Sequence, residues 1–188
     1  MIIFALKNDV KMKKSTLLIP FFLLVILCSG FCNLTIQEDA PEVAPDFTLP
    51  DTSGTGFTLS SLRGKYVILD FWGTWCKICL RGMPKLKAAQ DKYPGKFEIV
   101  GIDCGDKTVK WKHWVDSLSD KMPWRHVIMG RRLDVQRDYK IKGYPTKILV
   151  APDGKIIKSF VGEDPRFYLM LDEIFGEPAK QQNAGKSK

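Results

Sequence analysis

The sequence is poor in the residues that most often hold metals. It has two histidines, His113 and His126, and five cysteines among its 188 residues. Five cysteines in a chain of this length are too few for a fold built on disulfides, which is typical of shorter and denser sequences. A zinc site needs about four ligands, and only Cys104 and the two histidines could join the closely spaced pair Cys76 and Cys79. A metal site is therefore disfavoured.

Three other features are missing. No apolar run reaches the roughly 20 residues that a membrane-spanning helix takes, and the longest, Leu17–Leu27, contains Pro20. No repeat of the length found in repeat proteins is visible. No basic patch is interleaved with aromatic residues, so no nucleic-acid partner is predicted. With 45% apolar and 27% charged residues and a net charge of +8, the composition is typical of a soluble globular domain.

The first 31 residues have the layout of a secretory signal. A basic start precedes the apolar run, and the small residues Ser29 and Gly30 follow it. Lipid attachment at Cys28 or Cys32 is an open alternative. We expect a signal peptide or N-terminal anchor at 1–31, a linker at 32–43, one folded domain at 44–176 and a disordered tail at 177–188.

Patterns of buried strands and amphipathic helices alternate along the domain. Continuous apolar runs such as Tyr66–Trp72 are typical of strands covered on both faces. The alternation predicts an α/β fold with a mixed central sheet, helices on both of its faces and an N-terminal β-hairpin. The predicted strands are 46–49, 56–59, 66–72, 97–102, 124–129, 146–150 and 155–161. The predicted helices run from the cysteine pair to 93 and over 106–120, 131–139 and 164–175.

The cysteine pair lies in FWGTWCKICLRGMP, where a strand leads into a helix. Haem attachment needs a histidine after the second cysteine, but Leu80 stands there. A structural disulfide that closes so small a loop gains little stability. Redox chemistry fits better, because the N-terminus of a helix favours a thiolate at Cys76. Cys79 lies one turn further in. We therefore expect Cys76 to be the nucleophile and Cys79 the resolving thiol.

Four motifs in order resemble those of the thioredoxin-like superfamily. Ala44–Cys76 resembles the opening of envelope thiol-disulfide oxidoreductases of the TlpA/ResA type, and LDFWGTWCKIC resembles their active-site segment. Gly143–Thr146, GYPT, is similar to the loop that presents a cis proline to the active site, and Ala151–Gly162 resembles the hairpin after it. The resemblance covers about residues 44–175 and implies a thioredoxin-like fold.

The resemblance also implies roles for single residues. Pro145 would be the cis proline, with Tyr144 and Thr146 beside it in a substrate-binding loop, and Trp75 would contact a substrate protein. Asp70 matches the buried acid of thioredoxin. Burial raises the pKa of such a carboxyl, so we expect Asp70 to carry a proton to or from the second cysteine. The alternative is that it is merely hydrogen-bonded.

Two features depart from this pattern or stay open. The dipeptide Lys77-Ile78 between the cysteines is uncommon in the family. Because this dipeptide influences the redox potential, the direction of electron flow is open. Cys104 is expected to be a small buried hydrophobe, with a third redox thiol as the alternative.

Together these patterns predict a thiol-disulfide oxidoreductase of the cell envelope that exchanges electrons with disulfide-containing proteins. We expect a reductase, fed by a membrane thiol donor, with no cofactor, no metal and no nucleic-acid partner. Whether the leader is cleaved or retained as a membrane tether stays open. Two alternatives stay open. One is a copper carrier that uses the pair with Cys104 or His126. The other is a thiol peroxidase, although neither cysteine of the pair follows the Pro and Thr usual in that class.

Overall fold

A five-stranded sheet forms the centre of the computed structural model, whose described residues are 42–130 and 132–176. The strand order is β5-β4-β3-β6-β7. The central strand β3 pairs in parallel with β4 and antiparallel with β6, so the sheet is mixed, as the sequence predicts. The strands are β3 (Tyr66–Trp72), β4 (Phe97–Asp103), β5 (Arg125–Ile128), β6 (Thr146–Val150) and β7 (Ile156–Val161).

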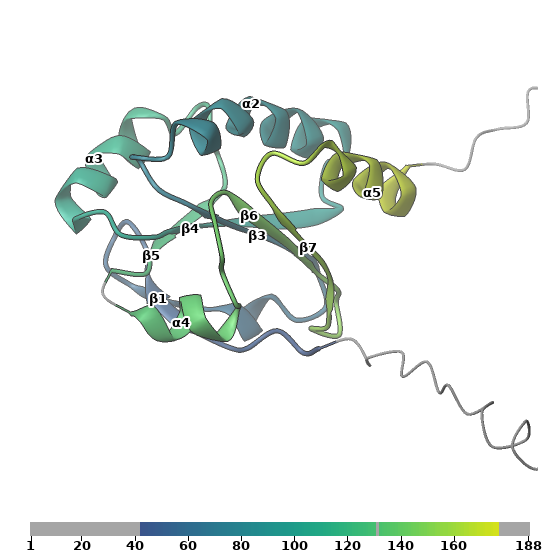
Figure 1. The fold of residues 1–188 in the computed structure, drawn as a ribbon, viewed down its shortest axis with the longest axis horizontal. Helices are drawn as coiled ribbons and strands as arrows, with labels where there is room; N and C mark the ends of the chain where they lie inside the picture. Colours follow the sequence, from purple (N-terminus) through teal and green to yellow (C-terminus); the bar gives the residue numbers. More distant parts are fainter. Residues whose placement is uncertain (1–41, 131, 177–188) are drawn as a thin grey trace, which may run out of the picture. The chain divides into compact units, whose positions relative to one another are not determined.

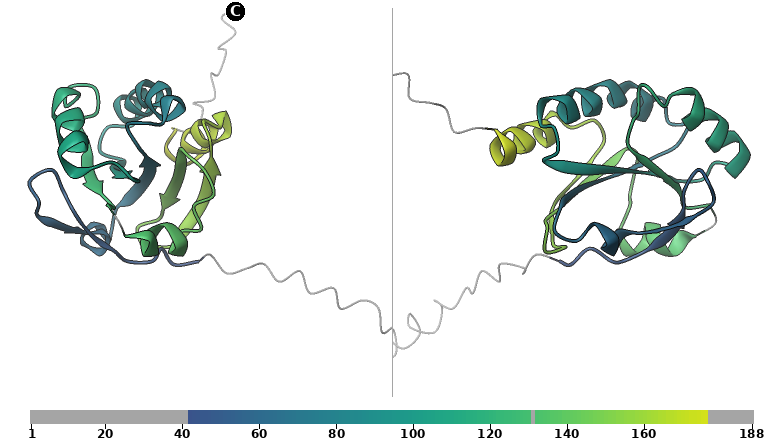
Figure 2. Two further views of the ribbon diagram at one scale, coloured as in Figure 1. Left: turned by 60° about the vertical axis from the view of Figure 1, so that its left-hand side comes forward. Right: turned by 180° about the vertical axis from the view of Figure 1, so that it is seen from behind.

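Helices cover both faces of this sheet, which confirms the predicted layers (Figures 1 and 2). One face carries α2, α3 and α5; the other carries α4, the β1–β2 hairpin and a short 3₁₀ helix. The helices are α2 (Lys77–Lys92), α3 (Thr108–Ser117), α4 (Leu133–Asp138), α5 (Pro165–Phe175) and the 3₁₀ helix η1 (Leu59–Leu62). The hairpin strands are β1 (Thr48–Pro50) and β2 (Gly56–Thr58).

Two apolar cores result, because successive side chains of a strand point to opposite faces. In β3, Ile68 and Trp72 pack beneath α2, α3 and α5, whereas Leu69 and Phe71 pack against α4 and the hairpin. We call the first side the disulfide face, since the buried pair of cysteines belongs to its cluster. We call the second the hairpin face.

The predicted N-terminal hairpin is an integral part of the hairpin face. Leu49 of β1 is fully buried there. The segment is joined to the rest by a bridge between Asp51 and Val127 and by a 2.6 Å hydrogen bond from the Tyr139 hydroxyl to the Pro45 carbonyl. The N-terminal extension therefore closes a face that α4 alone leaves open.

Some element boundaries differ from the predictions. Helix α3 spans Thr108–Ser117 rather than 106–120, because Lys107 is extended and Asp106 bonds elsewhere. Trp124 lies before β5 instead of in it. Asp164 caps α5 as expected, with Pro165 in the first turn.

Several predictions for the ends of the chain lie outside the described residues. They are the leader at 1–31, nearly all of the linker at 32–43 and the tail at 177–188. Within the described ranges, none of the helices has the length and apolar character that crossing a membrane requires.

Candidate active site

Cys76 and Cys79 form a disulfide at the start of α2. Cys76 is the N-cap residue, and its Sγ accepts a 3.3 Å hydrogen bond from the Cys79 backbone N–H. The pair lies directly after the C-terminal end of β3, as predicted. The exposed fraction is 6% for Cys76 and 2% for Cys79, so the disulfide is buried, with the first cysteine the more accessible.

The turn between β3 and Cys76 is held by a side chain that the sequence analysis missed. The carboxylate of Asp106 accepts hydrogen bonds from the backbone N–H and the hydroxyl of Thr74, each of 2.7 Å. Lys110 lies 3.1 Å from the same carboxylate. Burial alone would raise the pKa of Asp106, but hydrogen bonding with Asp103 and Thr74 outweighs it and holds this pKa below its usual value. The ionised carboxylate therefore fixes the active-site turn.

An aromatic pair, exposed Trp75 and half-buried Tyr144, lies beside the disulfide. Trp75 is 49% exposed, and its ring meets that of Tyr144 edge-to-face with the centroids 5.1 Å apart. The bond between Tyr144 and Pro145 is cis. Thr146 begins β6 beside Phe71 of β3, and its hydroxyl donates a 2.7 Å hydrogen bond to the Gly143 carbonyl. The structure thus brings the predicted substrate-binding residues to one edge of the disulfide.

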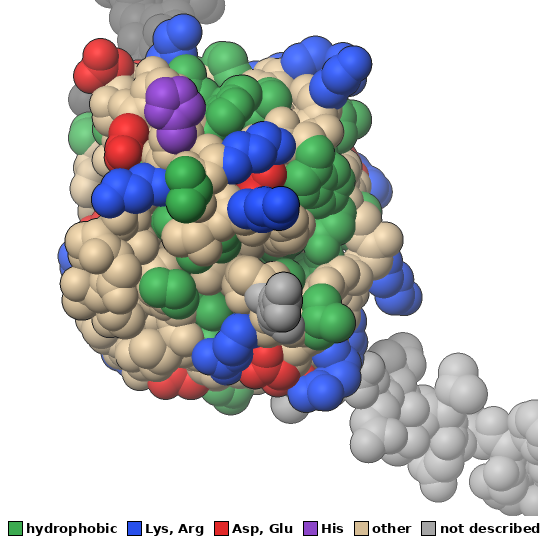
Figure 3. Space-filling model, turned by 90° about the vertical axis from the view of Figure 1, so that its left-hand side faces the viewer, with side chains coloured by type: hydrophobic (Ala, Val, Ile, Leu, Met, Phe, Trp, Pro, Cys, Tyr) green, Lys and Arg blue, Asp and Glu red, His purple; other side chains and the backbone are tan. Residues whose placement is uncertain are grey.

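Figure 3 looks onto the end of the domain where α2 begins, and hydrophobic and basic side chains are interspersed on this surface. Besides Trp75, Ile78 between the two cysteines is 40% exposed. Lys77, Arg81 and Lys107 are exposed as well. The residues next to the disulfide in the sequence therefore expose both apolar and basic side chains.

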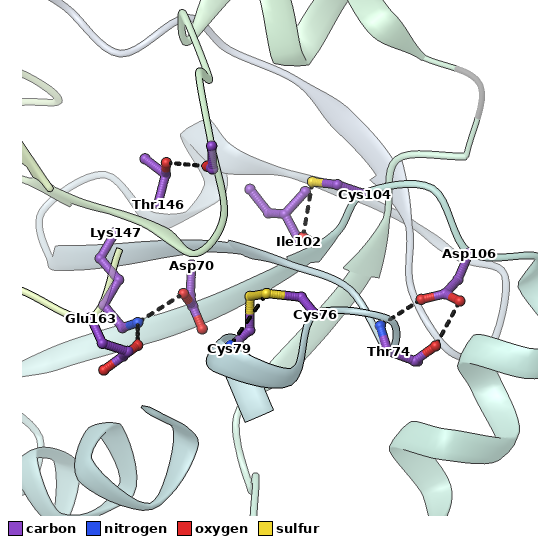
Figure 4. The surroundings of a disulfide bond; sticks show 11 residues. Asp70, Thr74, Cys76, Cys79, Ile102, Cys104, Asp106, Thr146, Lys147 and Glu163 are labelled. Atoms are coloured by element: carbon purple, nitrogen blue, oxygen red, sulfur yellow. Dashed lines mark hydrogen bonds and ion pairs between the residues drawn. A yellow bond between two sulfur atoms is a disulfide. The ribbon is translucent and has the colours of Figure 1, made fainter. Parts of the chain in front are cut away.

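Beneath the disulfide, Asp70 belongs to a buried group of charges (Figure 4). Lys147 of β6 pairs with Asp70 across the sheet, and its Nζ lies 3.5 Å from Asp70 Oδ1. The same ammonium donates a hydrogen bond to Glu163, which follows β7. Burial raises the pKa of Asp70, and the charge of Lys147 only partly offsets this effect. Asp70 is therefore a buried carboxyl that releases its proton less readily than a solvent-exposed aspartate.

Sequence reasoning found Asp70 but neither of its partners. The sequence does carry an indication of Lys147, because a lone charge inside the apolar strand TKILV predicts a buried ionic partner. Glu163 has none, since it lies in a short loop before α5 and reaches the site only through the fold. The Thr74–Asp106 pair likewise joins residues 32 positions apart.

Cys104 lies at the end of β4 and packs in the cluster of the hairpin face, with 5% exposure. Its thiol donates a 3.3 Å hydrogen bond to the Ile102 carbonyl, and burial raises its pKa. It is the small buried residue that we expected. Within residues 42–130 and 132–176, no three histidine, cysteine, aspartate or glutamate side chains gather as metal ligands would.

Comparison with known proteins places this site in a family. The sequence profile of the AhpC/TSA family matches residues 41–159. The thiol-disulfide oxidoreductase ResA of a Bacillus cereus strain is 32% identical over 164 residues, which cover 82% of this chain and 93% of that protein. The chain belongs to the thiol-disulfide oxidoreductases of this family. The thioredoxin-like protein YneN of Bacillus subtilis (strain 168) is also 32% identical, over 68% of this chain and 73% of its own.

Solved structures of other thiol-disulfide oxidoreductases agree with this family assignment. The thioredoxin domain of a thiol-disulfide oxidoreductase from Bacteroides vulgatus superposes with a TM-score of 0.64 at 30% identity, over 72% of this chain and 98% of that one. A putative thiol:disulfide interchange protein DsbE from Chlorobium tepidum gives a TM-score of 0.60, also at 30% identity, over 72% and 94%. The thioredoxin-like fold predicted from the sequence is confirmed.

Proposed function

We propose that this thiol-disulfide oxidoreductase reduces disulfides in proteins of the cell envelope, with Cys76 as the attacking thiol and Cys79 as the resolving one. The observation that carries the proposal is the placement of Cys76 at the N-cap of α2, more accessible than Cys79. A helix N-terminus favours negative charge, and the thiolate is the form of cysteine that attacks disulfides.

In the proposed reaction the reduced pair supplies two electrons. The Cys76 thiolate attacks one sulfur of the substrate disulfide, a mixed disulfide forms, and the other substrate sulfur leaves as a thiolate and takes up a proton. Cys79 then loses its proton and attacks the Sγ of Cys76. This step releases the second substrate thiol and forms the Cys76–Cys79 disulfide, which is the state of the present structure.

Asp70 is the proposed proton carrier for Cys79. Figure 4 shows its carboxyl between Lys147 and the disulfide, on the side of Cys79. When a dithiol donor reduces the pair again, Cys79 leaves as a thiolate, and a protonated Asp70 can return its proton. Asp70 is a general acid in this half of the cycle and a general base in the other.

The proposed platform for the substrate consists of Trp75, Tyr144, Pro145 and Thr146. The exposed ring of Trp75 and the half-buried ring of Tyr144 offer apolar contact area beside the disulfide. An extended substrate segment would lie along the loop that leads into β6, like a strand added at an edge. The exposed side chains of Lys77, Arg81 and Lys107 favour a segment that also carries acidic residues.

The location and the electron donor are proposals of the same kind. The apolar run after a basic start supports export by residues 1–31, as a cleaved signal or a retained anchor. Partners would then be disulfide-containing envelope proteins, and a membrane thiol carrier would supply the electrons. The names of the relatives support the exchange chemistry, while these partners follow from the leader.

The test is reduction of insulin by dithiothreitol in the presence of the purified domain, followed as turbidity. Cys76→Ser should lose all acceleration. Cys79→Ser should accumulate a mixed disulfide with the substrate, visible by non-reducing electrophoresis. Cys104→Ala is the matched control and should keep full activity. Full exchange in Cys76→Ser would overturn the assignment of the nucleophile.

The direction of electron flow is tested by the redox potential of the pair in glutathione buffers. A reductase should lie near the thioredoxin value of about −270 mV, whereas strong oxidants lie near −120 mV. A value at the oxidant end would reverse the proposed direction without changing the roles of the two cysteines.

A further inference from the structure

The buried charges beneath the disulfide are unequal in number: two carboxyl groups face one ammonium. Asp70 and Lys147 are each 3% exposed at the side chain, and Glu163 is 12% exposed. An ammonium has three protons to donate, but here they are not shared equally. Lys147 makes a hydrogen bond to Glu163 Oε1, whereas Asp70 Oδ1 lies 3.5 Å from Nζ and has no hydrogen-bond partner. Glu163 therefore holds the ammonium, and Asp70 is left short of a partner.

Glu163 is held in this position from three sides. Lys147 binds Oε1, and the Tyr168 hydroxyl of α5 donates a 3.3 Å hydrogen bond to Oε2. On the third side lies Gly82 of α2, one turn beyond Cys79. A Cβ atom at position 82 would collide with the Glu163 carboxylate, so the close approach depends on glycine. A loop residue is thus packed against the helix that carries the disulfide.

We propose that Lys147 and Glu163 are positioning residues that control when Asp70 gives up its proton. Glu163 engages the ammonium, so that Asp70 keeps its proton while the pair is oxidised. Lys147 stays close enough to compensate the Asp70 carboxylate once that proton has moved to Cys79. This inference rests on the proposed role of Asp70 in the exchange reaction.

The proton balance of the step is simple. A dithiol donor attacks Cys76, the disulfide bond breaks, and Cys79 leaves as a thiolate. The Asp70 carboxyl transfers one proton to that sulfur and becomes a carboxylate. The ammonium of Lys147 then faces two carboxylates. Glu163 is the most exposed of the three side chains, so a proton from solvent can reach Asp70 past Glu163.

Other titratable groups face Asp70 from the elements around it. The charge of Asp70 adds to the effect of burial in raising the pKa of the Cys104 thiol and of the Tyr168 hydroxyl. Both groups are therefore neutral at physiological pH. The groups are Cys76 and Cys79 on α2, Cys104 at the end of β4, Lys147 on β6, Glu163 after β7 and Tyr168 on α5. Among them, Lys147 and Glu163 act on the pKa of Asp70 through their charges, Lys147 lowering it and Glu163 raising it.

The experiment measures the Asp70 proton directly, by carboxyl carbon-13 NMR of the oxidised protein across pH. Asp70→Asn identifies the signal. Glu163→Gln removes the negative charge that competes with Asp70 for the ammonium, and this change favours the Asp70 carboxylate. The titration midpoint should therefore fall by about 1–3 pH units, the usual effect of a charge at this range. Lys147→Met removes the cation, so its midpoint should rise.

The matched control is Glu98→Gln, which neutralises a glutamate paired with Lys65 on the surface and should leave the midpoint unchanged. Glu163→Gln keeps the size and the acceptor oxygen, so it carries the test even if Lys147→Met does not fold. An unchanged midpoint in folded Glu163→Gln would overturn the proposal. So would equal shifts in Glu163→Gln and Glu98→Gln.

A second readout separates this inference from the proposed function. The rate at which dithiothreitol reduces the Cys76–Cys79 bond should fall in Glu163→Gln at pH values between the Asp70 midpoint of the variant and that of the unchanged protein, because over this range the protonated fraction of Asp70 is smaller in the variant. A shifted midpoint with an unchanged rate would refute the proton role of Asp70. An unchanged midpoint with normal insulin reduction would refute the positioning role of Lys147 and Glu163 and leave the proposed function intact.

Discussion

The two faces of the central sheet differ in what they bury. Four sheet residues with buried charged or titratable side chains all point to the disulfide face, beneath α2, α3 and α5; they are Asp70, Asp103, His126 and Lys147. The hairpin face buries apolar side chains together with the neutral polar groups of Thr146, Tyr139 and Cys104, each hydrogen-bonded to a backbone carbonyl. The buried charged groups of the sheet thus lie on one side, and the other side packs mainly apolar side chains.

Hydrogen bonding shows the same division. In the described ranges, five buried side-chain atoms have no hydrogen-bond partner, and all five belong to the disulfide face: Asp70 Oδ1, Trp72 Nε1, Asp103 Oδ2, Trp111 Nε1 and His126 Nδ1. Each such atom costs free energy, and most buried polar atoms are paired. The disulfide face therefore gives up stability to place ionisable groups near the cysteines.

The first and largest expected effect concerns the proton. Asp70→Asn should slow disulfide exchange by about 10²–10⁴-fold, the usual contribution of a general acid or base. The loss should appear in the step that involves Cys79, measured as slow resolution of the mixed disulfide in stopped-flow experiments. Equal slowing of the first attack by Cys76 would mean that Asp70 acts on the whole site.

A substitution on the hairpin face should lower stability and leave the exchange activity unchanged. Ile148, next to Lys147 in β6, is 1% exposed and packs on that face. Ile148→Ala should lower the free energy of unfolding by about 2–5 kcal/mol, measured by urea denaturation. Exchange activity per folded molecule should stay normal. A large loss of activity in the folded variant would contradict the separation of the two faces.

His126 should make the disulfide face sensitive to acid. Burial lowers the pKa of His126 to about 4, below the value of about 6.5 in an unfolded chain. As the pH falls from 6.5 to 4, the unfolded state takes up the proton first, so stability is lost over this window. The loss is on the order of 3 kcal/mol. In His126→Gln, the free energy of unfolding from urea denaturation should depend less on pH between 6.5 and 4. An unchanged pH dependence would contradict the proposed role of His126.

The smallest effect should come from a polar residue of the hairpin face. Thr146→Val removes one neutral hydrogen bond, that to Gly143, and keeps the shape of the side chain. The free energy of unfolding should fall by about 0.5–1.5 kcal/mol. The same urea series should show this decrease to be independent of pH between 4 and 8. A pH-dependent decrease would show that Thr146 is coupled to the titrating groups.

The sequence predicts those parts of the molecule that depend on local patterns. The buried strand Tyr66–Trp72 and the cap at Asp164 follow from periodicity and from residue preference. The cysteine pair at a helix start follows from the same reasoning. Helix α3 is shorter than its apolar pattern because Asp106 bonds to Thr74, a contact between distant segments.

The parts that the sequence does not predict depend on long-range packing. Nothing periodic links Lys147 to Glu163, because one lies in a strand and the other in a loop. Trp114 carries the helical spacing of a core residue, yet it is only half-buried. It lines an apolar groove with Leu80 and Met83 of α2. Whether such a side chain is covered depends on where a neighbouring helix lies.

The contact between Gly82 and Glu163 also has an evolutionary consequence. Any side chain at position 82 would push the Glu163 carboxylate off the ammonium of Lys147. Substitutions at these two positions, which are far apart in the chain, should therefore be coupled. In descendants of this sequence, the loss of glycine from α2 should accompany the loss of the acid before α5, so these two positions should covary.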